Sequence, residues 1–126
     1  MTRIITIRTG SIQLEAELND TSAADAVWNT VPYEARGSTW GNELYFRIPD
    51  QLNLTKENGQ DVVEAGDLGY WPVGNAFCIF YGPTPASSDE KPRPASPVTV
   101  FGKVIGDAAW LSEVKTGDII SVRRKE

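Results

Sequence analysis

Apolar and polar residues alternate strictly over residues 11–18, and this period of two predicts a half-buried antiparallel strand. The preceding segment, residues 3–8, is rich in β-branched residues, which favour strands. Thr9 and Gly10 form a turn signal between the two segments. The pattern therefore predicts an N-terminal β-hairpin with one core face and one charged face.

A second kind of pattern occupies residues 76–81, Ala-Phe-Cys-Ile-Phe-Tyr, which are all apolar or aromatic. Gly74-Asn75 and Gly82-Pro83 bound this run, so it predicts a strand that is buried on both faces. The strand before it is expected to end at Tyr70-Trp71. Two further strands are predicted near the C-terminus, over residues 97–105 and 118–123.

Gly41 separates two segments, residues 33–40 and 42–49, that predict a second hairpin with a glycine-containing turn. In the second arm apolar residues alternate with Glu43, Tyr45 and Arg47. The polar stretch over residues 50–61 predicts a loop that has room for one helical turn.

Two short helices interrupt the strands. Apolar residues recur at helical spacing over residues 24–31, behind a loose capping box that starts at Ser22, and Pro32 ends the pattern. Gly106-Asp107 begins a second helical turn. Each helix carries a tryptophan, Trp28 or Trp110, that we expect in the core.

The segments 63–68 and 114–119 share a pattern, a valine, two intervening residues, Gly-Asp and then an aliphatic residue. Glycine allows positive φ and aspartate accepts from nearby backbone, so both segments predict the same turn. Seven or eight short strands with two short helices favour a mainly β fold, a small closed barrel. One domain is expected over residues 1–126.

The charge balance is acidic, with 12 basic and 17 acidic residues and a formal net charge of -5. A nucleic-acid partner usually meets a basic face, so this balance argues against one. Arg123-Arg124-Lys125 is a basic cluster, which we interpret as a solvated chain end.

The chain has no histidine and a single cysteine, Cys78, inside the buried run. Histidine-based triads and histidine-ligated metals are therefore excluded, and we expect no metal, no cofactor and an inert buried thiol. No apolar run approaches membrane-spanning length and no signal-peptide core is present. The prediction is a cytoplasmic protein without a membrane partner.

Four motifs together resemble a family of small prokaryotic cyclophilin-like proteins of unknown function. They are Ala35-Arg36 with Trp40-Gly41-x-Glu43-x-Tyr45-Phe46, Gly66-Asp67-Leu68-x-Tyr70-Trp71-Pro72, Phe80-x-Gly82-Pro83-Thr84-Pro85, and Pro92-Arg-Pro-Ala-Ser-Pro97. The resemblance implies a cyclophilin-type fold, an eight-stranded barrel capped by two helices. It does not imply the cyclophilin reaction, because the Phe, Gln and Gly segment of true cyclophilins has no counterpart here and the histidine is absent.

We predict a non-catalytic binding domain that takes a small molecule or an extended peptide in an aromatic-lined cleft. No catalytic residue is assigned. For Arg36 and Glu43 a simple cross-strand ion pair remains the other interpretation, and for Thr84 it is turn stabilisation. The candidate cleft residues are Arg36, Trp40, Glu43, Tyr45, Trp71, Tyr81 and Thr84.

Two alternatives stay open. An atypical prolyl isomerase would use Arg36 or Arg47 to stabilise the twisted amide. A protein-interaction or homo-oligomerisation module would use residues 83–97, a proline-rich segment that predicts an extended surface loop.

Overall fold

The computed structural model of the chain describes residues 3–52, 54 and 59–125. Its described part contains nine strands, one α-helix and one 3-10 helix. The strands are β1 (Arg3–Thr9), β2 (Ile12–Leu18), β3 (Tyr33–Arg36), β4 (Ser38–Thr39), β5 (Glu43–Arg47), β6 (Asp67–Trp71), β7 (Ala76–Phe80), β8 (Thr99–Ile105) and β9 (Ile119–Arg124). The helices are α1 (Ser22–Thr30) and η1 (Ala108–Glu113).

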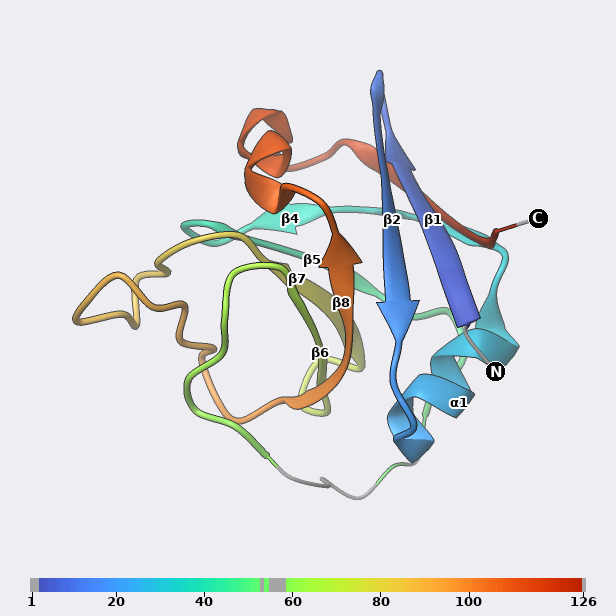
Figure 1. Cartoon of the computed structure of the whole chain (residues 1–126), viewed down its shortest axis with the longest axis horizontal. Coiled ribbons are helices and arrows are strands. Elements are labelled where there is room, and N and C mark those ends of the chain that lie inside the picture. The colour runs from blue at the N-terminus through green and yellow to red at the C-terminus, as the bar shows by residue number, and fades with distance from the viewer. Residues whose placement is uncertain (1–2, 53, 55–58, 126) are drawn as a thin grey trace.

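All nine strands join one sheet in the order β3-β9-β1-β2-β8-β6-β7-β5-β4, which curls into a nearly closed barrel (Figure 1). Each hydrogen-bonded pair between named strands is antiparallel. The prediction of a mainly β barrel with two short helices is confirmed. Figure 1 places α1 at the lower right of the barrel and η1, the short orange-red helix, at the upper left.

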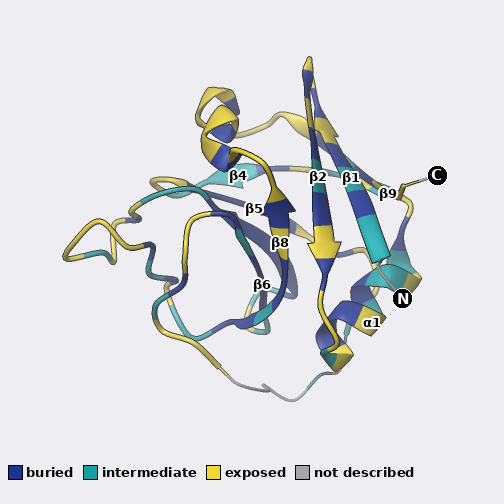
Figure 2. Cartoon of the chain, in the orientation of Figure 1, coloured by how far each residue is buried: buried dark blue, intermediate teal, exposed yellow. Residues whose placement is uncertain are grey.

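The N-terminal hairpin forms as the alternation predicts. β1 and β2 pair in register from Arg3 with Leu18 to Thr9 with Ile12. The apolar residues of β2 are buried, whereas Gln13 and Glu17 are exposed, and Figure 2 shows this alternation along the strand. The other edge of β1 pairs with β9, so the first and last strands of the chain are neighbours.

β7 is the buried strand that the apolar run predicts, since every one of its residues is buried. Its hairpin with β6 turns through Asn75, which has φ +48° and is itself buried. The Asn75 side chain accepts from the Tyr70 hydroxyl at 2.7 Å and donates to the Ile48 carbonyl at 3.2 Å. One amide thus satisfies polar groups from two neighbouring segments inside the core.

The predicted hairpin over residues 33–49 is correct for its inner half and wrong for its outer half. β4 pairs with β5, whereas β3 pairs with β9. The chain crosses from one partner to the other at Gly37, where a Cβ atom would lie 2.8 Å from a Leu44 methyl carbon and 3.0 Å from Ile120 Cγ1. Only glycine fits this crowded crossing, which brings the two ends of the sheet together.

Helix α1 begins at a different cap from the predicted one. Its N-cap is Thr21, whose hydroxyl accepts from the Ala24 amide at 3.1 Å. The N-cap therefore lies one residue before the predicted Ser22, and the residue at position N3 is Ala24, whose side chain cannot complete a capping box. Ala24 and Val27 are buried, as the helical spacing predicts, and the helix ends at Thr30, two residues before Pro32.

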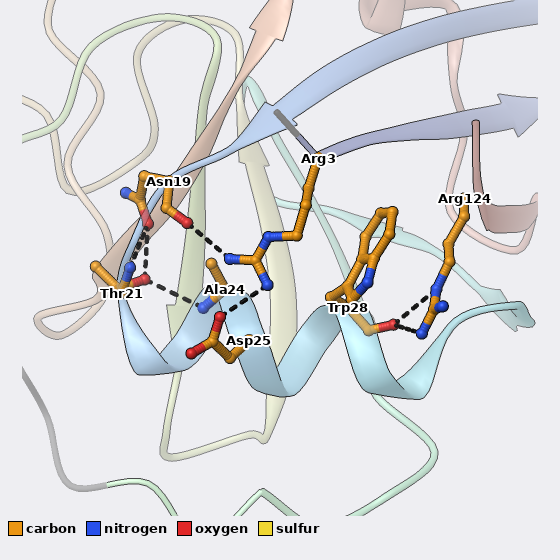
Figure 3. Close-up of polar contacts among 7 residues, drawn as sticks. All are labelled: Arg3, Asn19, Thr21, Ala24, Asp25, Trp28 and Arg124. Carbon is orange, nitrogen blue, oxygen red and sulfur yellow. Dashed lines mark hydrogen bonds and ion pairs between the residues drawn. The ribbon is translucent and has the colours of Figure 1, made fainter. Parts of the chain in front are cut away.

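Trp28 of α1 contacts Arg3 and Arg124, which lie near the two ends of the described chain (Figure 3). It is only partly buried against the core, and its ring lies 4.5 Å from the Arg124 guanidinium carbon and 5.9 Å from that of Arg3. Arg124 also donates to the Trp28 carbonyl at 2.9 Å, and Arg3 forms an ion pair with Asp25 at 2.7 Å. Arg124 of the basic cluster thus packs on the helix instead of being a simple solvated end.

Trp110 does not lie in the core, and the prediction for it is wrong. Its exposed fraction is 61%, whereas Ala108 and Leu111 are buried. A 3-10 helix has about three residues per turn, so residues 108 and 111 share the inner face and residue 110 points away from it.

The two Gly-Asp turns adopt the same geometry, as their shared pattern predicts. Gly66 and Gly117 have φ values of +96° and +102°. Asp67 and Asp118 each accept through a side-chain oxygen from the amide three residues earlier, at 2.8 Å and 2.9 Å. The helical turn considered for residues 50–61 falls on a segment in which residues 53 and 55–58 lie outside the described residues.

Candidate functional site

The site begins at the tight turn between β4 and β5. Trp40 and Glu43 flank the two-residue loop Gly41-Asn42, and the Trp40 amide donates to the Glu43 carbonyl at 2.9 Å. Gly41 has φ +60°, which glycine adopts without steric cost. The turn therefore holds the Trp40 and Glu43 side chains at one end of β5.

The Gly82–Pro85 turn packs directly on this hairpin. The Asn42 amide donates to the Pro83 carbonyl at 2.9 Å, and a Cβ atom at Gly41 would lie 2.8 Å from Pro85 Cδ. At Gly82 a Cβ atom would lie 2.8 Å from the side-chain Nδ2 of Asn42. Two of the four sequence motifs thus interlock, and each needs its glycine because the other turn is so close.

The proline-rich loop, residues 83–97, folds back over the same region. The Thr84 hydroxyl donates to the Arg93 carbonyl, and the Ser87 hydroxyl donates to the Lys91 carbonyl at 2.8 Å. Pro92 and Pro94 are buried although the loop between them and Thr84 is largely exposed (Figure 2). This arrangement places Pro94 and Ala95 opposite the β4–β5 turn.

Two aromatic side chains form adjoining walls. Tyr45 of β5 and Trp71 of β6 have ring centroids 6.4 Å apart and planes at 77°. The Trp71 indole nitrogen donates to the Ser96 hydroxyl at 2.6 Å, which fixes the ring against the proline-rich loop. A Cβ atom at Gly74 would lie 2.8 Å from the same ring, so the Gly74 backbone supports it from another side.

These elements enclose a cavity of about 210 Å³, which we call the Glu43 pocket. It is mainly apolar, and Glu43 is the one charged residue among the described residues that line it. The lining residues are Trp40, Glu43, Tyr45, Trp71, Pro94, Ala95 and Val98.

Glu43 is unusual because its carboxyl group is buried and forms no ion pair with a basic side chain of the described residues. The residue is 6% exposed, and Oε1 has no hydrogen-bond partner in the described part of the chain. The Cys78 thiol of β7 hydrogen-bonds this carboxyl group. Burial nevertheless dominates and raises the pKa of Glu43 from 4.5 to about 7, although the thiol hydrogen bond lowers it.

Two neighbouring groups respond to the same burial and charge. Burial raises the pKa of the Cys78 thiol well above its usual value, and the Glu43 charge adds to this effect. Burial and, to a lesser extent, the Glu43 charge also raise the pKa of Tyr81. Cys78 therefore stays protonated near neutral pH and acts as a donor to Glu43, not as a nucleophile.

The structure gathers four of the predicted site residues, Trp40, Glu43, Tyr45 and Trp71, around one cavity. Arg36 lies elsewhere, because β3 turns away to pair with β9. It donates to the Gly117 carbonyl at 3.0 Å and forms no ion pair with Glu43. The ion-pair interpretation of Arg36 and Glu43 is therefore wrong.

Tyr81 and Thr84 lie close to the cavity without lining it. Tyr81 is partly buried and packs against the main core. Thr84 is 6% exposed, and its hydroxyl stabilises the proline-rich loop. It donates to the Arg93 carbonyl and accepts from the Ala86 amide at 3.2 Å. This is the turn-stabilising role that the sequence left open for Thr84.

Arg36 and Arg47 line a second hollow, of about 230 Å³, together with Tyr45 and Trp71. Both arginines are exposed. The pair Tyr45 and Trp71 thus lines both hollows, the acidic Glu43 pocket and the basic one.

Sequence reasoning missed the pocket residues Pro94, Ala95 and Val98, as well as the contact between Cys78 and Glu43. The proline-rich composition did single out the loop, but as a surface contact and not as a cavity wall. The missed signal is the resemblance motif over residues 92–97, which contains two of these residues.

The described residues contain neither a metal-binding cluster nor a membrane-spanning helix. They contain no group of three or more His, Cys, Asp or Glu side chains that could hold a metal ion. None of the helices within them is long and apolar enough to cross a membrane.

A curved antiparallel barrel with two short helices and an aromatic pocket beside a proline-rich loop defines the class, a barrel of the cyclophilin type. The family described as Cyclophilin-like matches residues 3–123, and this chain belongs to that family.

One solved structure supports the same assignment. The solution structure of the hypothetical protein AF2241 from Archaeoglobus fulgidus is similar to this chain, with a TM-score of 0.84 and 35% sequence identity. The similarity covers 98% of this chain and 95% of the archaeal one. The comparison with curated proteins finds no match.

Proposed function

We propose that this cyclophilin-like chain is a ligand-binding domain, which holds one compact group of a small molecule or extended peptide in the Glu43 pocket. The observation that carries the proposal is the pocket itself, an aromatic cavity of about 210 Å³ with a buried, unpaired carboxyl oxygen. Apolar walls with few polar groups are typical of ligand sites.

The size of the cavity limits what it holds. Pockets for drug-sized ligands measure roughly 300–1,000 Å³, so about 210 Å³ suits one side chain or one small head group. The rest of a longer ligand would extend along Tyr45 and Trp71, which also line the hollow with Arg36 and Arg47. An extended peptide fits this description because its alternate side chains reach successive hollows.

The four tryptophans provide the test, because each has one indole N–H signal in an NMR spectrum. On titration with a proline-containing tetrapeptide, we expect the Trp40 and Trp71 signals to shift in a saturable manner. The exposed Trp110 lies outside the pocket, so its signal is the internal control.

Two variants sharpen this experiment. Trp71→Ala removes one wall and should abolish the shift at Trp40, whereas Trp110→Ala should leave it intact. The amide spectrum of each variant reports whether the barrel is folded. A peptide response that survives Trp71→Ala in a folded protein would contradict the proposal, as would the absence of any saturable response.

The isomerase alternative is tested in the same sample. It requires a donor beside the bound amide, yet Arg36 and Arg47 line the neighbouring hollow and not the Glu43 pocket. We expect cis/trans exchange of the tetrapeptide at its uncatalysed rate. Faster exchange that disappears in Arg36→Ala or Arg47→Ala would favour the isomerase instead.

Oligomerisation through the proline-rich loop stays a prediction. The inner face of this loop forms a wall of the pocket, whereas Ser88, Asp89 and Glu90 at its tip are exposed. Light scattering over a range of protein concentrations tests it, and a constant monomer mass would contradict it.

A further inference from the structure

We infer that the group held in the Glu43 pocket is an organic cation, an alkylated or protonated amine whose charge meets the Glu43 carboxylate and whose carbon substituents meet the aromatic walls. The inference rests on the proposed function, because it names the ligand class of the same pocket.

The charge of Glu43 favours a cationic ligand in the pocket. Glu43 is the only charged residue that lines the pocket, and its Oε1 has no hydrogen-bond partner among the described residues. A buried carboxylate without a counter-ion is costly, and a bound cation removes most of that cost. A ligand that brings positive charge therefore gains more from this pocket than a neutral ligand of the same shape.

Among the described residues, the protein's own groups that act on Glu43 supply no positive charge. Cys78 of β7 is a thiol and Tyr81, just beyond β7, is a phenol; the Glu43 charge raises the pKa of both. On the proline-rich loop the Arg93 guanidinium lies 3.9 Å from the Asp89 carboxylate. Arg36 donates to the Gly117 carbonyl and lines the neighbouring hollow, not the Glu43 pocket.

The aromatic residues that line the Glu43 pocket also favour a cationic ligand. The faces of aromatic rings carry partial negative charge and attract cations, tryptophan most strongly. Trp40, Tyr45 and Trp71 all line the cavity, and the rings of Tyr45 and Trp71 stand at 77° to each other. Two walls at nearly a right angle with a carboxyl group beside them form a three-sided enclosure for a compact cation.

The net charge of -5 acts in the same direction at longer range, because it draws cations toward the protein and repels anions. This effect changes the rate of association more than the affinity. The pocket itself must therefore supply the selectivity that an experiment can measure.

The test compares two probes of one shape, choline and 3,3-dimethylbutan-1-ol, which differ only in the charged nitrogen that replaces a carbon. Both are titrated at pH 8 with the Trp40 and Trp71 indole signals as the readout. We expect choline to bind about tenfold more tightly or better. Equal affinity of the two probes would overturn the cation inference and leave the pocket as a binding site.

The charge of Glu43 gives a second readout. With a pKa of about 7, the ionised fraction rises about tenfold from pH 6 to pH 8, and choline affinity should rise with it. A neutral ligand that accepts a hydrogen bond from protonated Glu43 would show the opposite trend. Choline affinity that falls with pH would therefore contradict the inference.

Glu43→Gln keeps the size of the side chain and removes its charge. It should abolish both the preference for choline and its pH dependence, whereas Glu34→Gln, an exposed control on β3, should change neither. If neither probe shifts the signals while the tetrapeptide does, the cation inference fails alone. If the tetrapeptide also fails, the proposed pocket function fails with it.

Discussion

The buried carboxyl group of Glu43 makes a quantitative prediction about stability. In the unfolded chain its pKa returns to the ordinary value of 4.5, whereas in the folded protein it is about 7. The folded state therefore binds the proton more tightly than the unfolded state does. Below pH 4.5 both states are protonated and ionisation of Glu43 costs no stability. Between pH 4.5 and pH 7 the unfolded state ionises while the folded carboxyl group stays protonated, so stability falls as the pH rises, and the loss is complete above pH 7, where the folded state ionises as well.

The magnitude follows from the two pKa values. At about 1.4 kcal/mol per pH unit, the full loss is about 3.5 kcal/mol, of which about 2.5 kcal/mol develops between pH 5 and pH 8. This is a large part of the roughly 5–15 kcal/mol that stabilises an ordinary domain. Glu43→Gln removes the ionisation, so its free energy of unfolding should not show this loss.

The measurement is urea unfolding of the wild type and Glu43→Gln at pH 5 and pH 8. The variant should gain about 2.5 kcal/mol on the wild type between the two pH values, whatever its stability at pH 5. Comparing the change between pH values cancels the constant cost of placing an amide beside the Cys78 thiol. Glu34→Gln should show no such gain. If the difference between Glu43→Gln and wild type is the same at both pH values, the carboxyl group is not desolvated and the reasoning is wrong.

Three further substitutions test how the pocket and the helix are held. Gly41→Ala should lower the free energy of unfolding by about 2–3 kcal/mol, because the new Cβ atom meets the neighbouring turn and the backbone is strained at positive φ. Gly10→Ala is the control, since Gly10 has a similar φ of +58° but nothing within 4 Å. Its free energy of unfolding in urea should fall by only about 1 kcal/mol. Thr84→Val removes the hydroxyl that donates to the Arg93 carbonyl, so the free energy of unfolding should fall by about 1–2 kcal/mol. Tetrapeptide binding, measured by NMR, should also weaken. Unchanged binding would show that the position of the proline-rich loop does not depend on this hydrogen bond. Thr21→Ala removes the N-cap of α1 and should cost about 1 kcal/mol in thermal or urea unfolding, whereas no loss would count against Thr21 as the cap.

Strands with a clear period or a continuous apolar run were predictable from the sequence. The N-terminal hairpin and β7 form where the pattern places them, because hydrophobic burial decides both the strand and its face. The split at Gly37 was not predictable in this way. Local pattern reports which face of a strand is buried, but not which distant strand pairs with its edge.

The candidate site shows the same contrast between residues that local patterns identify and residues whose position depends on distant contacts. Trp40, Glu43, Tyr45 and Trp71 were assigned from motifs, and the barrel brings them together because β5 and β6 are both neighbours of β7. Arg36 was assigned from the same motif as Trp40, on the expectation that residues 33–49 form one hairpin, and the change of partner at Gly37 moves it away from the pocket. The loop residues Pro94 and Ala95 reach the cavity through tertiary hydrogen bonds that no local pattern records.

Helix η1 illustrates a limit of periodicity. The segment 108–113 is too short for its apolar residues to define one buried face, and Ala108, Trp110 and Leu111 were all possible core residues by pattern. Which of them is buried depends on how the segment packs on the barrel, not on its own residues.

The position of β9 between β1 and β3 has a consequence for how the chain is made. A ribosome releases the N-terminal strands first, and at about 5–20 residues per second the last strand follows roughly 6–25 s later. Throughout this interval the outer edge of β1 has no partner in the nascent chain, since residues 119–124 do not yet exist. Arginines at both ends of that edge, Arg3 and Arg8, keep it charged, which is a common protection of open strand edges against pairing with other chains. Barrel closure is therefore a late, non-local event, and the expected folding is slow compared with that of helical domains of this length.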